Sequence, residues 1–446
     1  MHDSTTHGPI VDIRQLRIGL HVHLDLGWMQ HPFPLNSFRI ASEEQLQTLR
    51  GLGLEHVRIL PQRSDVEPLR ALVDAGALAA ADAGPAAQPV VVAPPPAAPV
   101  ETPEQAQARR RREALEAELA CAHQAERQYA EAGRALKRSF ELAISQPAAA
   151  REHCETHMNG LLGKLLGADE MAIRLLSEGA GDRASLHAVN VTVLSLLLGK
   201  QLGLSKEDMF DLGTGAMLHD VGKLELPDRV RWLDPMTPGV SNAERQFYQD
   251  HVSHGVTIGR KMGLMPGALL VLAQHHELAD GSGFPLKLAG EKISPAARIV
   301  ALINRYDNLC NPATPSQALT PHEALALIYG QMKARFDSAV FGAFIRMMGV
   351  YPPGSVVQLS DDRYGMVVTV NAARPLKPCV LVHDPKQSRD TALPLDLERT
   401  PELGIRRSLK PQHLPRATLD YLSPRTRTCY FFEPAREMFA MGEAVA

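Results

Sequence analysis

The stretch that decides the fold of this chain runs from position 275 to position 285 and reads His275-His276-Glu277-Leu278-Ala279-Asp280-Gly281-Ser282-Gly283-Phe284-Pro285. Two adjacent histidines are followed by carboxylates, two spaced glycines and a proline. Neutral imidazoles and carboxylates are ligands suited to iron, manganese, zinc and nickel, whereas glycine and proline mark a tight turn. The stretch therefore predicts a metal site that continues into a loop.

Further candidate ligands lie on both sides of this stretch: His187, the dipeptide His219-Asp220 followed by Lys223, His251, and downstream Asn304 and Asp307. A lone His-Asp dipeptide is a weak signal for a metal. Several histidines near predicted helix ends or glycine-containing turns are hard to explain as core residues, because each would need its own buried partner. Metal ligation accounts for all of them, and Asp220 is the candidate bridge between adjacent cations.

Length, charge and cysteine usage limit the classes of protein. A chain of 446 residues exceeds the usual size of one core, so two or three domains are expected. The net charge of -3 gives no electrostatic case for nucleic acid as the main partner. The cysteines form no CxxC pair, and the longest strongly apolar run, 189–198, is too short to span a bilayer. We therefore expect a cytoplasmic protein without a membrane span.

The first part of the chain predicts a small α+β regulatory module over residues 1–70. Strands are expected at 10–13, 20–24 and 56–60, and a helix at 42–51. An aromatic and proline cluster between them is expected to fill a small core, with a ligand role as the alternative; its members are Trp28, Pro32, Phe33, Pro34 and Phe38. Residues 71–102 are rich in alanine and proline and are expected to form a linker.

The remaining chain predicts three further parts. A long helix is expected over 103–149, with an apolar stripe of Leu115, Leu119, Ala122, Tyr129, Leu136 and Phe140. That stripe is a candidate either for pairing with its copy in a homodimer or for packing on the next domain. Residues 150–350 read as almost entirely helical, in segments at 150–178, 183–202, 206–221, 243–262, 266–277, 295–309, 321–333 and 337–349. Residues 351–446 predict a β-rich appendage with strands at 356–357, 365–370 and 379–382.

The order His187, His219-Asp220, Lys223, His251, His275-His276 and then Asp280-Gly281-Ser282-Gly283-Phe284-Pro285 resembles the HD-GYP family of HD-superfamily phosphohydrolases. The resemblance covers residues 150–350, and segment 10–62 looks like the small module that often precedes this domain. It implies a multidomain protein with a mainly α-helical catalytic domain. It also implies that cyclic di-GMP is the ligand, with a diguanylate cyclase or other signalling proteins as candidate partners.

The resemblance carries roles to individual residues. The matching metal ligands are His187, His219, Asp220, His251, His275 and His276. Asp220 and Lys223 match catalytic residues, and Lys223 matches a lysine thought to contact the substrate phosphate. The loop residues expected to shape the substrate site are Asp280, Gly281, Gly283, Phe284 and Pro285. Phe284 stands where the family usually has tyrosine, so stacking is retained while the hydroxyl is lost.

Two departures from the family pattern affect the metals. Asn304 occupies the place of the last metal-ligating aspartate, where an amide oxygen is a weaker ligand. Asp307 lies one helical turn further on and is a candidate substitute, although it matches a different family aspartate. Arg183 replaces the glutamate that members with three metals carry before His187. We therefore expect at most two divalent transition metal ions, with iron or manganese favoured.

The leading hypothesis is a phosphodiesterase that opens cyclic di-GMP to pGpG and onward to GMP. Two cations would bind the scissile phosphate and lower the pKa of a bridging water, Asp220 would bridge them, and Lys223 would neutralise developing charge. Asn304 favours an alternative, a catalytically weak or inactive cyclic di-GMP receptor or protein-interaction module. A phosphohydrolase acting on mononucleotides is disfavoured by the Gly-Phe-Pro loop.

Overall fold

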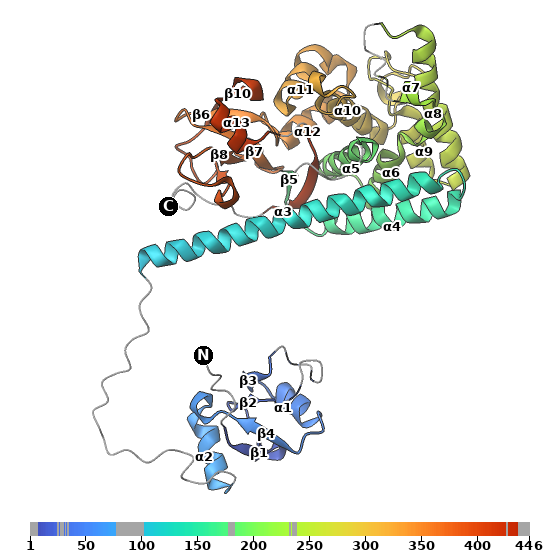
Figure 1. Cartoon of the computed structure of the whole chain (residues 1–446). Coiled ribbons are helices and arrows are strands. Elements are labelled where there is room, and N and C mark those ends of the chain that lie inside the picture. Colours follow the sequence, from blue (N-terminus) through green and yellow to red (C-terminus); the bar gives the residue numbers. More distant parts are fainter. Residues whose placement is uncertain are drawn as a thin grey trace. The chain divides into compact units, whose positions relative to one another are not determined.

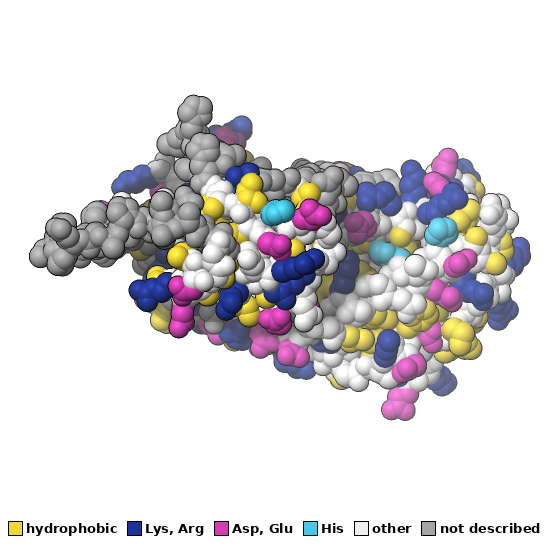
Figure 2. Space-filling model, turned by 90° about the horizontal axis from the view of Figure 1, so that it is seen from below, with side chains coloured by type: hydrophobic (Ala, Val, Ile, Leu, Met, Phe, Trp, Pro, Cys, Tyr) yellow, Lys and Arg dark blue, Asp and Glu magenta, His cyan; other side chains and the backbone are white. Residues whose placement is uncertain are grey.

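A computed structural model describes residues 8–24, 26, 31, 33, 35–76, 102–176, 183–231, 233, 239–424 and 427–435. The chain divides into two compact units, residues 1–100 and 101–446. Within the described ranges, no helix is long and apolar enough to cross a membrane. On the face shown in Figure 2, acidic and basic side chains of the described residues are interspersed, without an extended patch of one sign.

The N-terminal unit is the predicted α+β module. Its antiparallel sheet has the order β1-β4-β2-β3, with β1 at Ile10–Asp12, β2 at His21–His23, β3 at Ser37–Arg39 and β4 at His56–Ile59 (Figure 1). Helix α1 spans Glu43–Arg50 and α2 spans Val66–Asp74. Strand β3 and helix α2 were not predicted, and α2 continues past position 71, where the linker was expected to begin.

The two described rings of the aromatic cluster pack against the core of this unit. The rings of Phe33 and Phe38 lie 4.5 Å apart between centroids and contact the buried core. These two rings therefore fill the small core, as predicted, and are not placed to bind a ligand. Trp28, Pro32 and Pro34 lie outside the described residues.

The second unit begins with a helical hairpin. Helix α3 spans Pro103–Leu142 and α4 spans Pro147–Leu166, and the two lie side by side (Figure 1). Thr102 starts α3 with a capping box to Gln105. The prediction of one helix to residue 149 was wrong, because Pro147 lacks an N–H and its ring would clash with the carbonyl one turn earlier. Pro147 instead takes the first turn of α4.

The buried face of α3 is rotated from the predicted stripe. Tyr129 and Leu136 are buried as expected, whereas Leu119 is 43% exposed. The buried set is Ala114, Glu118, Ala125, Tyr129, Ala132, Leu136, Ser139 and Leu142. This face packs within its own unit, on α4, α5 and β11. The prediction missed the rotation because this face mixes Tyr129, Leu136 and Leu142 with small alanines, Ser139 and the ion-paired Glu118, which a search for large apolar residues does not find.

The central part is helical, as predicted. Its elements are α5 (Arg183–Gln201), α6 (Lys206–Leu218), η4 (Val221–Glu225), α7 (Asp228–Arg231), α8 (Asn242–Met262), α9 (Pro266–Gln274), α10 (Pro295–Cys310), α11 (Pro321–Leu327) and α12 (Ser338–Met348). Helix α5 is buried along most of its length and contacts α3, α6, α10 and α12. Side-chain caps from Ser205, Ser241, Ser294 and Thr320 begin α6, α8, α10 and α11.

The C-terminal strands form one sheet together with β5, a strand that lies between α4 and α5 in the sequence. The path β10-β6-β7-β5-β11 joins β5 (Met171–Leu175), β6 (Val356–Leu359), β7 (Tyr364–Asn371), β10 (Ile405–Leu409) and β11 (Tyr430–Pro434). Strand β8 (Cys379–Val382) pairs with β7 and with β9 (Leu395–Asp396). The predicted strands are confirmed, but the helix expected over 150–178 was wrong in its second half. Residues 171–175 are extended because both partners, β7 and β11, come from distant sequence.

Candidate metal centre

The structure brings the predicted histidines and Asp220 to one place. His187 lies on α5, His219 and His275 end α6 and α9, and His251 lies on α8. One group, whose candidate ligand atoms lie within 4.8 Å of one another, contains Asp220, His251, His275 and His276. A second such group contains His187, His219 and Asp220. Asp220 belongs to both groups, which is the placement required of a bridging carboxylate.

Backbone carbonyls orient three of the imidazole rings. His219 Nδ1 lies 2.7 Å from Ala216 O, and His275 Nδ1 lies 2.9 Å from Leu272 O. His251 Nδ1 makes the same kind of bond to Tyr248 O. A carbonyl oxygen can only accept, so each Nδ1 carries the proton. The Nε2 atom of each ring is therefore left with a lone pair.

These Nε2 atoms face one another across the centre. His251 Nε2 lies 3.2 Å from His275 Nε2, and His187 Nε2 lies 3.2 Å from His219 Nε2. Burial lowers the pKa of His219 to about 4 and the pKa values of His251 and His275 to about 3, so these rings are neutral at pH 7. Lone pairs facing each other repel, and a cation between them would turn that repulsion into ligation.

Asp220 and His276 add buried atoms without partners. Within the described residues, Asp220 Oδ1 and His276 Nε2 have no hydrogen bond. Asp220 Oδ2 lies 3.5 Å from His219 Nε2, and Oδ1 lies 3.7 Å from His251 Nε2. Burial opposes ionisation, but Lys223 and the histidines hold the pKa of Asp220 well below its usual value. A carboxylate with one oxygen toward each histidine group fits divalent cations of the transition series.

Asp307 lies behind His187 and not inside the centre. Its Oδ2 lies 2.6 Å from His187 Nδ1, and its Oδ1 accepts hydrogen bonds from Asn190 and Asn311 at 2.7 and 2.9 Å. Both oxygens are thus engaged away from the other histidines. The geometry does not favour Asp307 as a substitute ligand. It makes Asp307 the group that directs His187 Nε2 toward His219.

Asn304 presents an amide whose oxygen is already engaged. Asn308 Nδ2 donates to the backbone oxygen of Asn304 at 2.9 Å, which requires the NH₂ group of Asn308 to face Asn304. The side-chain atom of Asn304 that lies 2.6 Å from the same nitrogen is therefore its oxygen. Asn304 is buried and lines the cavity above the centre. A carboxylate here would offer a second oxygen, whereas the amide offers a donor.

Glu277 organises the loop that follows the paired histidines. It is 1% exposed, and its two oxygens accept hydrogen bonds from the backbone N–H groups of Leu286 and Leu288 at 2.6 and 2.8 Å. Sequence reasoning assigned Glu277 no separate role, although its place beside His276 was visible. Because a buried carboxylate needs such partners, Glu277 ties the loop to the end of α9.

Only some of the loop residues predicted to shape the substrate site line the cavity. A Cβ atom on Gly283 would lie 2.5 Å from both His276 O and Leu278 N, so only glycine fits there. The Phe284 ring stacks on His276 with centroids 4.4 Å apart, and both Gly283 and Phe284 line the cavity. Asp280 instead closes an exposed turn by accepting bonds from Ser282. Asp280, Gly281 and Pro285 do not line the cavity.

The centre opens into a cavity of about 620 Å³. Among the described residues, its lining contains the cationic side chains of Lys223, Arg231, Arg305 and Arg335 and a single carboxylate, that of Asp220. Lys223 Nζ lies 2.6 Å from Asp220 Oδ2 and 5.2 Å from the centre of the Tyr248 ring. Burial opposes the charge, but Asp220 raises the pKa of Lys223. Tyr248, Arg305 and Arg335 were missed from sequence because nothing local distinguishes them from ordinary helix residues.

Comparison with known proteins finds matches to two family models. Residues 170–340 match the HD domain family, and residues 10–154 match a domain of unknown function, DUF3391. Residues 170–340 are therefore assigned to the HD domain family. The predicted resemblance to the HD-GYP family is confirmed by its relatives.

Two curated relatives and one solved structure illustrate the likeness. A cyclic di-GMP phosphodiesterase of Pseudomonas aeruginosa is 27% identical over 377 residues, which cover 83% of this chain and 84% of that protein. A cyclic di-GMP phosphodiesterase response regulator of Xanthomonas campestris pv. campestris is 36% identical over 154 residues, 34% of this chain and 39% of that protein. A solved HDG"Y"P protein from Bdellovibrio bacteriovorus is 16% identical, with a TM-score of 0.38, covering 76% of this chain and 98% of that one.

Asp307→Asn in this protein is expected to lower metal retention with little loss of stability. The asparagine oxygen can still accept from Asn190 and Asn311, but its NH₂ group would then face His187 Nδ1. That would move the ring proton to Nε2 and remove a ligand atom. Metal affinity should fall about 10–100-fold, the usual effect of losing such an outer partner. Metal content after dialysis and thermal unfolding measure the two effects; unchanged metal content would contradict the role of Asp307.

Asn304→Asp is expected to have the opposite effect on metal retention. The aspartate keeps one oxygen for Asn308 and turns a second, charged oxygen toward the cavity. Metal remaining after dialysis against a graded series of chelator concentrations should therefore rise. Gln317→Glu is the matched control, because it adds the same charge at another position on the cavity lining without removing the hydrogen bond that Asn308 donates to Asn304. Equal gains in both variants would show a general charge effect and not ligation at position 304.

Proposed function

We propose that this protein is a metal-dependent phosphodiesterase that hydrolyses cyclic di-GMP to pGpG and onward to GMP. The observation that carries the proposal is the pair of histidine groups sharing Asp220 at the floor of a cationic cavity. The names of the relatives support the choice of substrate. The cavity volume lies within the range of small-molecule sites and leaves room for more than a mononucleotide.

Two divalent transition metal ions, iron or manganese, are proposed as cofactors. His187, His219 and Asp220 would hold one ion, and Asp220, His251, His275 and His276 the other. Asn304 would be either a weak metal ligand or a hydrogen-bond donor beside the metal ions. When bound, such a pair supplies Lewis-acid polarisation of a phosphate and lowers the pKa of a water held between the ions. This donor set contains no thiolate, which favours these metals over soft ones.

The protein's own side chains would bind and orient the substrate. Lys223 extends from η4 into the cavity and would donate to a phosphate oxygen, stabilising charge that grows during cleavage. Losing one such donor typically costs about 3–4 kcal/mol of transition-state stabilisation. Arg305 and Arg335 would bind the phosphate that is not cleaved, since a cyclic dinucleotide carries two negative charges. Phe284 is placed to contact a guanine ring from the loop side.

Turnover of cyclic di-GMP by anaerobically purified protein, read by chromatography with added manganese or iron, tests this function. We expect pGpG as the first product, and slower cleavage of 3′3′-cyclic GMP-AMP, in which one guanine is replaced. The second candidate is a weak or inactive receptor, which the amide at Asn304 favours. Dinucleotide binding without turnover under both metals would overturn the enzyme and leave that receptor.

A further inference from the structure

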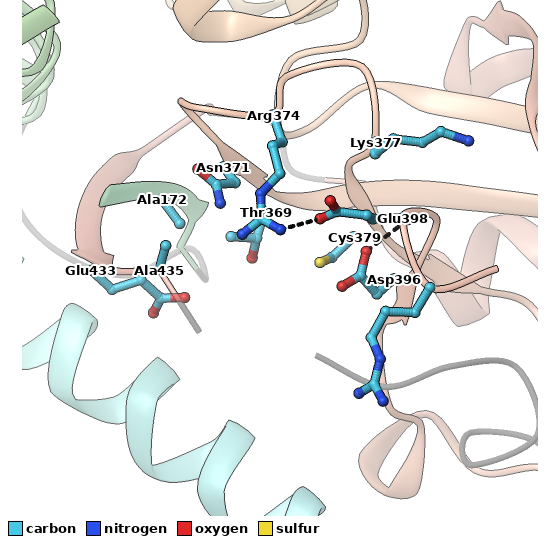
Figure 3. Close-up of a pocket in the computed structure, with 11 residues that line it drawn as sticks. Ala172, Thr369, Asn371, Arg374, Lys377, Cys379, Asp396, Glu398, Glu433 and Ala435 are labelled. Atoms are coloured by element: carbon cyan, nitrogen blue, oxygen red, sulfur yellow. Dashed lines mark hydrogen bonds and ion pairs between the residues drawn. The ribbon is translucent and has the colours of Figure 1, made fainter. Parts of the chain in front are cut away.

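A second cavity lies on the C-terminal sheet, away from the histidines. Its volume is about 350 Å³, and its lining comes from β5, β7, β8, β9 and β11 and from the segments that follow β7 and β9 (Figure 3). The floor contains the buried residues Thr369, Cys379, Asp396 and Glu433, whereas Arg374, Lys377 and Glu398 are exposed at the rim. The proposed reaction uses none of these residues.

Asp396 is a buried carboxylate without a cation. It is 7% exposed, and its Oδ1 accepts a hydrogen bond from the backbone N–H of Glu398 at 2.9 Å. In the described part of the chain, no lysine or arginine nitrogen lies within ion-pair distance of it. Burial is the main reason that the pKa of Asp396 is raised, and the charge of Glu398 adds to it, whereas the Glu398 N–H bond and the more distant charges of Arg399 and Arg374 oppose the rise. A carboxylate in this position is stabilised by any cationic group that enters the cavity.

Thr369 adds a second unsatisfied group to the floor. Its residue is 4% exposed, and its Oγ1 is buried without a hydrogen-bond partner among the described residues. Such a hydroxyl costs free energy that a bound donor or acceptor would recover. Glu433, in contrast, is satisfied, because Arg174 donates to its two oxygens at 2.6 and 2.8 Å.

The rim offers the opposite charge. Arg374 is paired with Glu398 at 2.7 Å and with Glu170 at 3.2 Å. Lys377 has no ion pair with a described residue, and its side chain extends along the rim away from Asp396 (Figure 3). Arg399 also lines the cavity and is not free of partners. Among the described lining residues, the charged side chains without an ion pair are therefore Asp396 at the floor and Lys377 at the rim.

We propose that this cavity binds a small zwitterion of the α-amino-acid class. The ligand ammonium group would bind Asp396 and Thr369, and its carboxylate would lie toward Lys377. A simple anion would meet the charge of Asp396, and an apolar ligand would leave both floor groups unsatisfied. The volume holds an amino acid with ordered water.

The cavity is joined to the proposed metal centre through β11. Arg174, which binds Glu433, also donates to Glu118 of α3 at 2.7 and 3.3 Å. Further along β11, Tyr430 N donates to Asn190 Oδ1 at 3.0 Å, and Asn190 donates to Asp307 behind His187. We therefore expect a ligand bound in this cavity to change the turnover of cyclic di-GMP. This link, unlike the binding site itself, rests on the proposed function.

The test uses the full chain and the standard α-amino acids. Pools are screened by thermal shift, and hits are measured by calorimetry. Asp396→Asn should weaken binding at least about tenfold, because a charged hydrogen bond is lost. Thr369→Val should weaken binding several-fold without lowering Tm, since its hydroxyl bonds to nothing in the described protein. Asp384→Asn is the matched control: Asp384 Oδ1 accepts from Lys386 N at 2.9 Å in a similar turn outside the cavity.

Two results would overturn the binding site. One is that no amino acid binds the wild type at millimolar concentration, and the other is that Asp396→Asn binds as tightly as the wild type. A bound amino acid that leaves turnover unchanged would overturn the link along β11. Because binding is measured without substrate, failure of the proposed phosphodiesterase and failure of this site give different results.

Discussion

Asp220→Ala is expected to abolish turnover of cyclic di-GMP and to release metal from both histidine groups. Asp220 is the single residue that the two groups share, and its oxygens face different histidines. Removing it also leaves the Lys223 ammonium without the carboxylate that lies 2.6 Å away. Because metal-assisted charge stabilisation is worth several kcal/mol, we expect turnover to fall by roughly 10³-fold or more.

Metal content and product chromatography on the same preparation measure this effect. Asp250→Ala is the matched control, since that carboxylate precedes His251 on α8 but bonds to Gln246 on the helix surface. It should keep both metal and turnover. If Asp220→Ala retained two metals per chain, the bridging role would be wrong even if turnover fell.

Gly222→Ala is expected to have the second largest effect, although glycine has no chemistry of its own. A Cβ atom at this position would lie 1.9 Å from His251 O and 2.4 Å from Gly255 N, both in the backbone of α8. Backbone cannot move aside as a flexible side chain can, so η4 and α8 must separate. Overpacking of this kind costs about 1–3 kcal/mol or more. It also moves Asp220 and Lys223 away from His251, so Tm, metal content and turnover should all fall.

The chain supplies a control on the other side of the same contact. A Cβ atom on Gly255 would meet its nearest neighbour, Gly222 N, at 3.5 Å, an ordinary van der Waals distance. Alanine is also a better helix former than glycine by about 1 kcal/mol. Gly255→Ala should therefore keep activity and hold or raise Tm. Equal behaviour of the two variants would contradict the close approach at Gly222.

The helices could be predicted from sequence wherever local signals decide them. Caps such as Ser205 and Thr320 and the apolar periodicity placed α5, α6, α8, α9, α10 and α12 within a few residues of their ends and located the start of α11, whereas the short helix α7 was not predicted. Strand β5 could not be predicted, because Met171–Leu175 is short and its extended form depends on β7 and β11. The break before α4 follows from Pro147, which cannot continue the preceding helix.

The candidate site likewise has features that the sequence predicts and features that it does not. The residue types and order from His187 to His276 are enough to indicate a metal site and a family. Sequence spacing also makes Asp307 a candidate ligand, because it lies one turn from Asn304. Its contact with His187 joins α10 to α5, and no spacing rule reveals such a bond between distant segments.

The sequence by itself determined which chemical groups this protein carries and where its helices begin, because ligand types, caps and periodicity are local properties. Only the tertiary structure decided which nitrogen of each imidazole faces the centre, since that depends on carbonyls such as Ala216 O and Leu272 O. It also decided that Gly222 must be glycine and that Asp396 is buried without an ion pair to any described residue. Those properties arise from contacts between segments far apart in the chain, and burial sets their energies.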